Sequence, residues 1–154
     1  VTAALVLTEM AAWYYDQGMT LYDALQALYK KYGDYAERTL NLVMPGLDGL
    51  KKMAALMREL RDHPLCEIAG VAVLQRKDYS SGILEDVSTG AREEMELKGS
   101  NVLKYKLADG TDLVVRPSGT EPKVKVYILA QGASKAVCDA TVAKYAAWAE
   151  TLKR

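Results

Sequence analysis

The feature that most constrains this chain is a short loop between two runs of strand-forming residues. Before the loop, the run from Leu113 to Val115 is apolar, and after it the run from Val124 to Leu129 places Val, Val and Ile at every second position. Alternation with a period of two is typical of a strand that buries one face. Pro117 and Pro122 fix the backbone φ angle at the two ends of the loop. The sequence therefore predicts a stiff loop that joins two neighbouring strands.

The residues of this loop carry groups that can bind an anion. Gly119 allows the backbone to approach a ligand closely or to adopt a positive φ angle. Ser118 and Thr120 supply hydroxyls, successive amides in such a turn can form an anion-binding nest, and Arg116 supplies a planar guanidinium suited to phosphate. A second interpretation stays open on these residues alone: a tight connection whose hydroxyls cap its own backbone while Arg116 pairs with Glu121.

The run Arg-Pro-Ser-Gly-Thr-Glu-Pro-Lys at 116–123, followed by an alternating strand, resembles the phosphate-binding loop of the α-D-phosphohexomutases. This family includes phosphoglucomutase and phosphomannomutase, and the loop belongs to its last domain. The order of elements from about Val1 to the C-terminus is similar as well. Lys125 stands where many relatives have arginine, which keeps the charge but loses the bidentate fork. The resemblance implies that the substrate phosphate is bound by Arg116, Ser118, Gly119, Thr120 and Lys125, with Glu121 orienting the loop.

The resemblance also implies a reaction. Enzymes of this family are isomerases that move a phosphoryl group between the C1 and C6 oxygens of a hexose phosphate, such as glucose or mannose phosphate. They use a phosphorylated serine and a Mg²⁺ ion held by clustered aspartates. This chain shows neither of these motifs, nor the family's sugar-reading loop. We therefore expect no catalytic residue and no metal ligand in it, and we interpret it as a C-terminal fragment that is inactive alone, with Mg²⁺ bound elsewhere in the full-length enzyme.

The pattern of elements divides the chain into two parts. Residues 1–37 are expected to form a helix pair, which the resemblance identifies with the last helices of a preceding sugar-binding domain. Residues 38–154 read as strand, helix, strand, strand, strand, helix. This order predicts a two-layer α+β domain with a mostly antiparallel four-stranded sheet and two helices on one face. The resemblance implies the shape of half of the TATA-binding protein for this C-terminal phosphate-binding domain, and its partners include the remaining domains of the full-length chain.

Three further expectations concern the local structure. The helical run 3–13 is apolar on nearly every face, so it is expected to need cover on all sides. Residues 34–37 are expected to be a hinge, and residues 78–100 a solvated charged connection. Thr20 and Asp23 have the spacing of a capping box at the start of a second helix. The buried stripe of that second helix is predicted to consist of Leu21, Leu25, Leu28 and Tyr32.

Composition excludes several classes of partner. Twenty basic and twenty acidic residues cancel, so the chain has no electrostatic footprint for nucleic acid. The run 3–13 is interrupted by Glu9 and is too short to span a membrane. Cys66 and Cys138 lack metal-ligand spacing, and reduced thiols favour a cytoplasmic origin. Two alternatives to a mutase domain remain: a stand-alone phosphate-binding module, and a protein-interaction domain that docks through its first helix.

Overall fold

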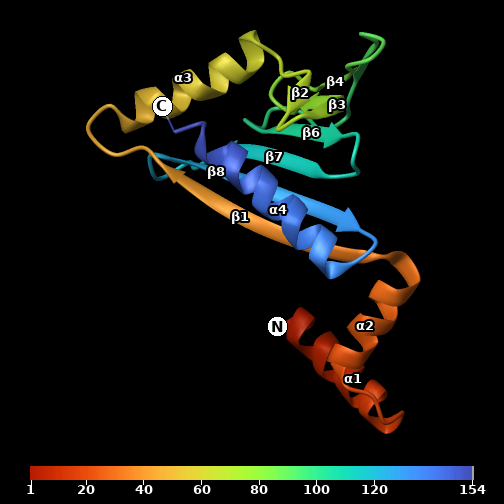
Figure 1. Cartoon of the computed structure of the whole chain (residues 1–154). Helices are drawn as coiled ribbons and strands as arrows, with labels where there is room; N and C mark the ends of the chain where they lie inside the picture. Colours follow the sequence, from red (N-terminus) through yellow and green to blue (C-terminus); the bar gives the residue numbers. More distant parts are fainter. Residues whose placement is uncertain (154) are drawn as a thin grey trace.

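A computed structural model describes residues 1–153 and shows a β-sheet with helices on one face, preceded by a pair of helices (Figure 1). The helices are α1 (Thr2–Asp16), α2 (Leu21–Tyr32), α3 (Gly49–Asp62) and α4 (Lys135–Glu150). The strands are β1 (Asp34–Val43), β2 (Glu67–Ile68), β3 (Val71–Asp78), β4 (Ile83–Asp86), β5 (Arg92–Glu94), β6 (Leu103–Leu107), β7 (Asp112–Pro117) and β8 (Lys123–Gly132).

The strands form one sheet in the order β1-β8-β7-β6-β3-β4-β5, with β2 paired to β3. The strands of each pair run antiparallel. The predicted α+β class and antiparallel sheet are therefore confirmed. The predicted number of four strands is wrong, because the sheet of the described residues has eight. Helices α3 and α4 both pack into the core on one face, as predicted.

The additional strands lie mainly in the segment 78–100, which we expected to be a charged connection. The turn residues in this segment separate short strands instead of belonging to one long loop. The Asp86 carboxylate accepts hydrogen bonds from the amides of Ser88 and Thr89 at 3.0 and 2.9 Å, which closes the turn between β4 and β5. Gly82 and Gly90 have φ angles of 75° and 72°, which glycine adopts without strain.

Strand β8 shows how the sheet divides into a covered face and an open face. Every second residue of this strand is buried under the helices, and the residues between them are at least partly exposed. The neighbouring strands continue the same pattern, so the core lies between the sheet and helices α3 and α4. The buried residues of β8 are Val124, Val126, Ile128 and Ala130.

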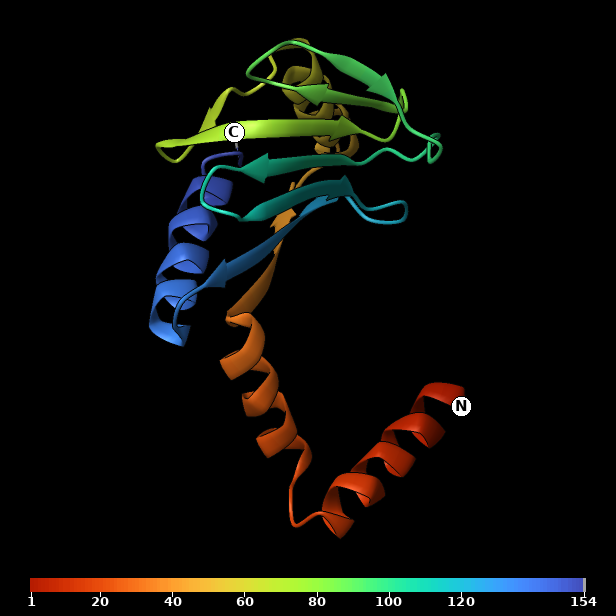
Figure 2. The same ribbon diagram turned by 90° about the vertical axis from the view of Figure 1, so that its right-hand side faces the viewer.

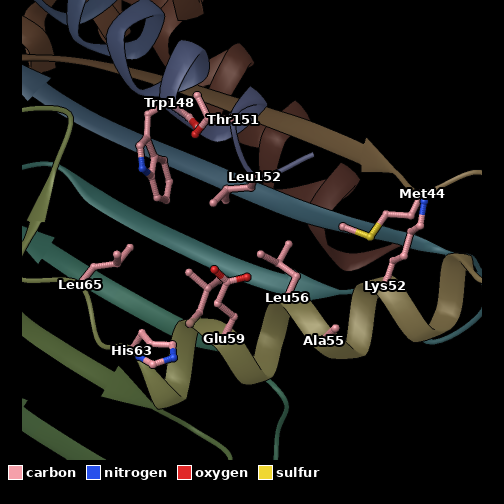
Figure 3. Close-up of a pocket in the computed structure, with 11 residues that line it drawn as sticks. Met44, Lys52, Ala55, Leu56, Glu59, His63, Leu65, Trp148, Thr151 and Leu152 are labelled. Atoms are coloured by element: carbon pink, nitrogen blue, oxygen red, sulfur yellow. The ribbon is translucent and has the colours of Figure 1, made fainter. Parts of the chain in front are cut away.

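Helices α3 and α4 leave a pocket of about 360 Å³ between them, over the strands (Figure 3). Its lining is mainly apolar and includes Leu56 from α3 and Trp148 and Leu152 from α4. His63 ends α3, where its backbone N–H donates to the carbonyl of Glu59 at 2.9 Å, and its ring lines the pocket.

The helix pair behaves differently from the predicted packing. The capping box is present: the Thr20 hydroxyl accepts from the Asp23 amide, and the Asp23 carboxylate accepts from the Thr20 amide. The predicted buried stripe of α2 is wrong, since Leu25, Leu28 and Tyr32 are 41, 50 and 56% exposed. Helix α1 buries no residue, and the two helices extend away from the sheet as a V (Figure 2). Both helices carry the predicted apolar residues, but no other part of residues 1–153 packs against them to bury these residues. None of the helices in this range has the length and apolar character that a membrane crossing needs.

The segment 34–37 is not a hinge, because it forms the first residues of β1. Tyr35 lies opposite Gln131 and Glu37 opposite Leu129 in the ladder with β8. The Cys138 thiol donates to the carbonyl of Asp34 at 3.2 Å, which joins this end of β1 to α4. The change from helix to strand takes place at Gly33, whose φ angle is 91°. The domain division at 37/38 stays a prediction.

The first testable consequence concerns the hydrogen bond between Tyr145 of α4 and Asp109 in the β6–β7 turn. The buried Tyr145 hydroxyl donates to Asp109 Oδ2 at 2.5 Å. Burial alone would raise the pKa of Asp109, but the hydrogen bonds from Tyr145 and from the Thr111 amide outweigh it and lower this pKa. We expect Tyr145→Phe to reduce the free energy of unfolding by about 1.5–3 kcal/mol at pH 7.

The pH dependence follows from the direction of that shift. A lowered pKa in the folded state stabilises the protein above the unfolded pKa, near 3.9 for Asp, and this contribution disappears as the pH falls through the folded value. The difference between the native chain and Tyr145→Phe should therefore shrink below about pH 4. Urea unfolding at pH 7 and at pH 3 measures this difference in the free energy of unfolding, with Tyr22→Phe on exposed α2 as the control. A difference that is equal at both pH values would contradict this assignment.

A second consequence concerns the uncovered helix pair. Deleting residues 1–32 should leave the urea midpoint for unfolding of the sheet unchanged within experimental error. The reason is that α1 contributes nothing to the core and α2 buries only Ala24 among the described residues. The deletion should also reduce self-association, since a contiguous exposed apolar surface favours it. Light scattering over a concentration series compares the two chains. A full chain that stays monomeric at every concentration would argue against an adhesive surface on α1 and α2.

Candidate anion-binding site

The candidate loop lies at the end of the β7–β8 hairpin. Strand β7 includes Pro117, and β8 begins at Lys123, so the free loop is limited to residues 118–122. The Ser118 amide donates to the carbonyl of Lys123 at 2.8 Å, and the Lys123 amide donates to the carbonyl of Glu121 at 2.7 Å. The Thr120 amide lies 3.5 Å from Ser118 Oγ. The predicted short loop between two strands is therefore confirmed, and its own backbone bonds hold it in shape.

The base of the loop is attached to two other elements. The Met44 amide, just after β1, donates to the carbonyl of Pro122 at 2.8 Å. The start of α3 approaches the same residue closely: a Cβ atom at Gly49 would lie 2.8 Å from Pro122 Cβ and 2.1 Å from the Met44 carbonyl oxygen. Gly49 is thus required for this contact. The sequence alone does not indicate this role, because the contact joins segments that are far apart in the chain.

Arg116 and Lys125 lie directly opposite each other on β7 and β8. Their neighbours Val115, Val124 and Val126 are buried, so the two cationic residues occupy positions of the open face. Arg116 is exposed, and its guanidinium has neither an ion pair nor a hydrogen bond within residues 1–153. Like charges directly across two strands destabilise a sheet. An anion bound between Arg116 and Lys125 would remove this repulsion.

The alternative interpretation is wrong in pairing Arg116 with Glu121, whereas its other part is seen in the Ser118 hydroxyl, which accepts from the Thr120 amide of the same loop. Glu121 Oε2 lies 2.5 Å from Lys123 Nζ. The hydrogen bond from the Lys123 ammonium group lowers the pKa of Glu121, and the charges of Lys123 and Lys125 act in the same direction. The carboxylate is therefore engaged with its own loop, and the guanidinium of Arg116 stays available to a ligand. An orienting role for Glu121 stays a prediction.

Gly119 is not explained by backbone conformation. Its φ angle is outside the positive region that eight other glycines adopt in the described chain. A Cβ atom placed on Gly119 would meet no protein atom within 4 Å. A glycine is therefore not needed at position 119 for a positive φ angle. The close approach of a ligand to the backbone is the other role expected for Gly119, and the open space is compatible with it.

A metal site is not formed by the described residues. Within residues 1–153, no group of three His, Cys, Asp or Glu side chains is arranged to hold a metal ion. The acidic residues Glu93 and Glu94 lie in β5, and Asp86 binds its own turn. The described residues therefore offer no ligand set for the Mg²⁺ ion, which the family resemblance places in another part of the full-length enzyme.

The fold and the loop together define an α+β domain with a candidate anion site at the end of a hairpin. Residues 40–144 match the family described as phosphoglucomutase/phosphomannomutase, C-terminal domain. The chain is 34% identical over 110 residues to phosphoglucomutase of Staphylococcus saprophyticus, which covers 71% of this chain and 20% of that protein. It is 33% identical over 113 residues to phosphoglucomutase of Staphylococcus haemolyticus, with 73% and 20% covered. The chain therefore belongs to the phosphoglucomutase/phosphomannomutase family and contains its C-terminal domain.

Two further facts describe the extent of this similarity. The chain spans about a fifth of the length of the curated relatives that it matches, since 20% of each is covered. A solved structure of parafusin, a phosphoglucomutase from Paramecium, in its open form superposes with a TM-score of 0.48 at 11% identity. That superposition covers 87% of this chain and 22% of the parafusin chain.

The open space at Gly119 yields a test. Gly119→Ala should keep or raise the free energy of unfolding, by up to about 1 kcal/mol, because alanine restricts the unfolded chain where the native φ angle permits it. The same methyl group should weaken phosphate binding, because it occupies the approach of the ligand. Gly110→Ala is the matched control: its φ angle of 86° predicts a loss of stability with little change in binding. Urea unfolding and phosphate titration of each variant give the two readouts. If Gly119→Ala binds phosphate as tightly as the native chain does, the absence of a side chain at Gly119 has no role in ligand binding.

Proposed function

We propose that this chain is the phosphate-holding domain of a hexose-phosphate mutase, an enzyme that moves a phosphoryl group between C1 and C6 of a sugar such as glucose or mannose. The observation that carries the proposal is the exposed, unpaired Arg116 opposite Lys125, next to a loop with open space at Gly119. Family membership supports the reaction class. The proposal includes a cytoplasmic location, where free thiols such as those of Cys66 and Cys138 stay reduced.

The proposed role of the loop is positioning and charge neutralisation. The guanidinium of Arg116 offers two parallel N–H groups to two phosphate oxygens, and Lys125 adds a second positive charge. The hydroxyls of Ser118 and Thr120 and the amides beside Gly119 supply further donors. Every one of these groups addresses phosphate oxygens and not the sugar. The loop can therefore hold the phosphate whether it is attached to C1 or to C6, which a reversible transfer between the two positions requires.

The proposal assigns the remaining chemistry to parts of a longer chain. In it, the other domains provide the phosphoryl donor, the contacts to the sugar and the Mg²⁺ ion, which would supply charge neutralisation during transfer. Phosphoryl transfer demands mainly accurate positioning and electrostatic stabilisation. A domain that only holds one phosphate group therefore contributes the positioning of that phosphate. The isolated chain is therefore expected to show no mutase activity with glucose 1-phosphate and Mg²⁺ in a coupled assay.

The phosphate-binding role is tested by titrating the isotope-labelled chain with inorganic phosphate and with glucose 1-phosphate. We expect the amides of residues 118–121 to shift, with a dissociation constant on the order of millimolar, equivalent to about −4 kcal/mol. Arg116→Lys should weaken binding by about tenfold, since it keeps the charge but loses the second bond, and Arg116→Ala should weaken it further. Arg58→Ala, on the exposed side of α3, is the charge-matched control.

Two results would overturn the proposal. If amides elsewhere shift while residues 118–121 stay unchanged, the loop is only a turn. If Arg116→Ala and Arg58→Ala weaken binding equally, the chain attracts anions without a defined site. Turnover by the chain alone that is lost on Arg116→Ala would contradict the assignment of the remaining chemistry to other domains.

A further inference from the structure

A second pair of like charges faces each other on the open face of the sheet. Lys77 of β3 lies directly opposite Lys104 of β6, in the same way as Arg116 lies opposite Lys125. Such pairs cost stability in the free protein. Within the described residues, the ammonium group of Lys77 has no ion pair or hydrogen bond that would offset this cost. The feature that marks the proposed phosphate site therefore occurs a second time, away from the loop.

The second pair borders a hollow in the surface. A depression of about 220 Å³ is lined by Gln75, Lys77, Lys104, Lys106 and Asp112. The depression is open to solvent on one side, so a small solute can enter it. The depression is built by three adjacent strands: Gln75 lies opposite Lys106, and Lys106 lies opposite Asp112. Its lining residues are therefore held at fixed spacing by the sheet.

The charges around the depression do not cancel. Asp112 Oδ2 lies 3.0 Å from Lys104 Nζ, and Asp112 Oδ1 lies 3.7 Å from Lys106 Nζ. One carboxylate thus stands against three ammonium groups. A further acid on this face, Asp86 opposite Gln75, is engaged by the amides and hydroxyls of Ser88 and Thr89. The excess of two positive charges matches the charge of a phosphate monoester.

The depression also has an unused acceptor. The Oδ1 atom of Asp112 is buried and has no hydrogen-bond partner in the described structure. Lys106 Nζ, which lies nearby, donates instead to the carbonyl of Gly110 at 3.0 Å. Buried acceptors are normally paired, and Asp112 Oδ1 has capacity to accept a hydrogen bond. A hydroxyl on the bound molecule would supply such a donor while its phosphate contacts the lysines.

We propose that this depression is a second anion-binding site, which takes a small phosphate ester that also carries hydroxyl groups. It differs from the loop site in Lys106 and Asp112, which lie opposite each other; Asp112 is four residues from Arg116 on β7, or about 13 Å at 3.3 Å per residue. Lys104 lies between the two sites, opposite Val114, which is two residues from Arg116 along the strand. The inference does not depend on the function proposed for the loop, since it rests on different residues of the same face.

The test uses the labelled chain and three probes: inorganic phosphate, glucose and glucose 6-phosphate. Glucose 6-phosphate should shift the amides of Lys77, Lys104 and Lys106 and saturate at about tenfold lower concentration than inorganic phosphate, because only the ester adds a hydroxyl donor. Glucose alone should leave these amides unchanged. Lys77→Gln should weaken binding of the ester by about tenfold and, in the absence of ligand, raise the urea midpoint, because it removes the repulsion with Lys104.

Two control variants separate this site from other sources of binding. Lys30→Gln, on exposed α2, should change neither readout. Arg116→Ala should silence the loop and leave the shifts at Lys77 and Lys104 intact. The inference is overturned if these amides do not respond to glucose 6-phosphate, if Arg116→Ala abolishes their shifts together with those of the loop, or if Lys30→Gln weakens binding as much as Lys77→Gln. A silent loop beside a responding Lys77 would refute the proposed function and leave the second site standing.

Discussion

The pairing of strand β8 with both β1 and β7 is the interaction on which the rest of the structure depends. Its alternate residues, including Val126 and Ile128, are buried beneath the helices, and its remaining residues lie on the open face. A slip of one residue would exchange the two sets, so burial of the core fixes the register strongly. That register is also what places Lys125 opposite Arg116. The geometry of the candidate site is thus a consequence of core packing, although no residue of the site belongs to the core.

Local signals in the sequence were sufficient for the parts of the fold that local interactions determine. The capping box at Thr20 and the alternation in β8 each depend on residues that are close in the chain. The loop 118–122 was located for the same reason. Strands β4 and β5 were missed because a short strand is defined by its neighbours in the sheet, and the turn residues around Gly82 and Gly90 look the same in a hairpin and in an irregular loop.

Two features of the site required the folded chain. Glu121 pairs with Lys123 and not with Arg116, a choice that depends on how the loop closes. Gly49 permits α3 to approach Pro122, a contact between residues far apart in sequence. The helix pair shows a different limit of the sequence. The pattern of α2 correctly predicts an amphipathic helix, but an apolar stripe does not specify which surface covers it. Periodicity gives the face of a helix, and only tertiary structure gives the partner of that face.

The open face shows how the chain combines binding with stability. Placing Arg116 opposite Lys125, and Lys77 opposite Lys104, disfavours the free sheet, yet each pair directs two positive charges toward the same region of solvent. The covered face compensates through the burial of β6, β7 and β8 against α3 and α4. Because the two faces are separated by the thickness of one sheet, substitutions of these charges, which the two proposals expect to change anion affinity, create no cavities in the core. Affinity on the open face and packing on the covered face can therefore vary independently, provided that the register of β8 is kept.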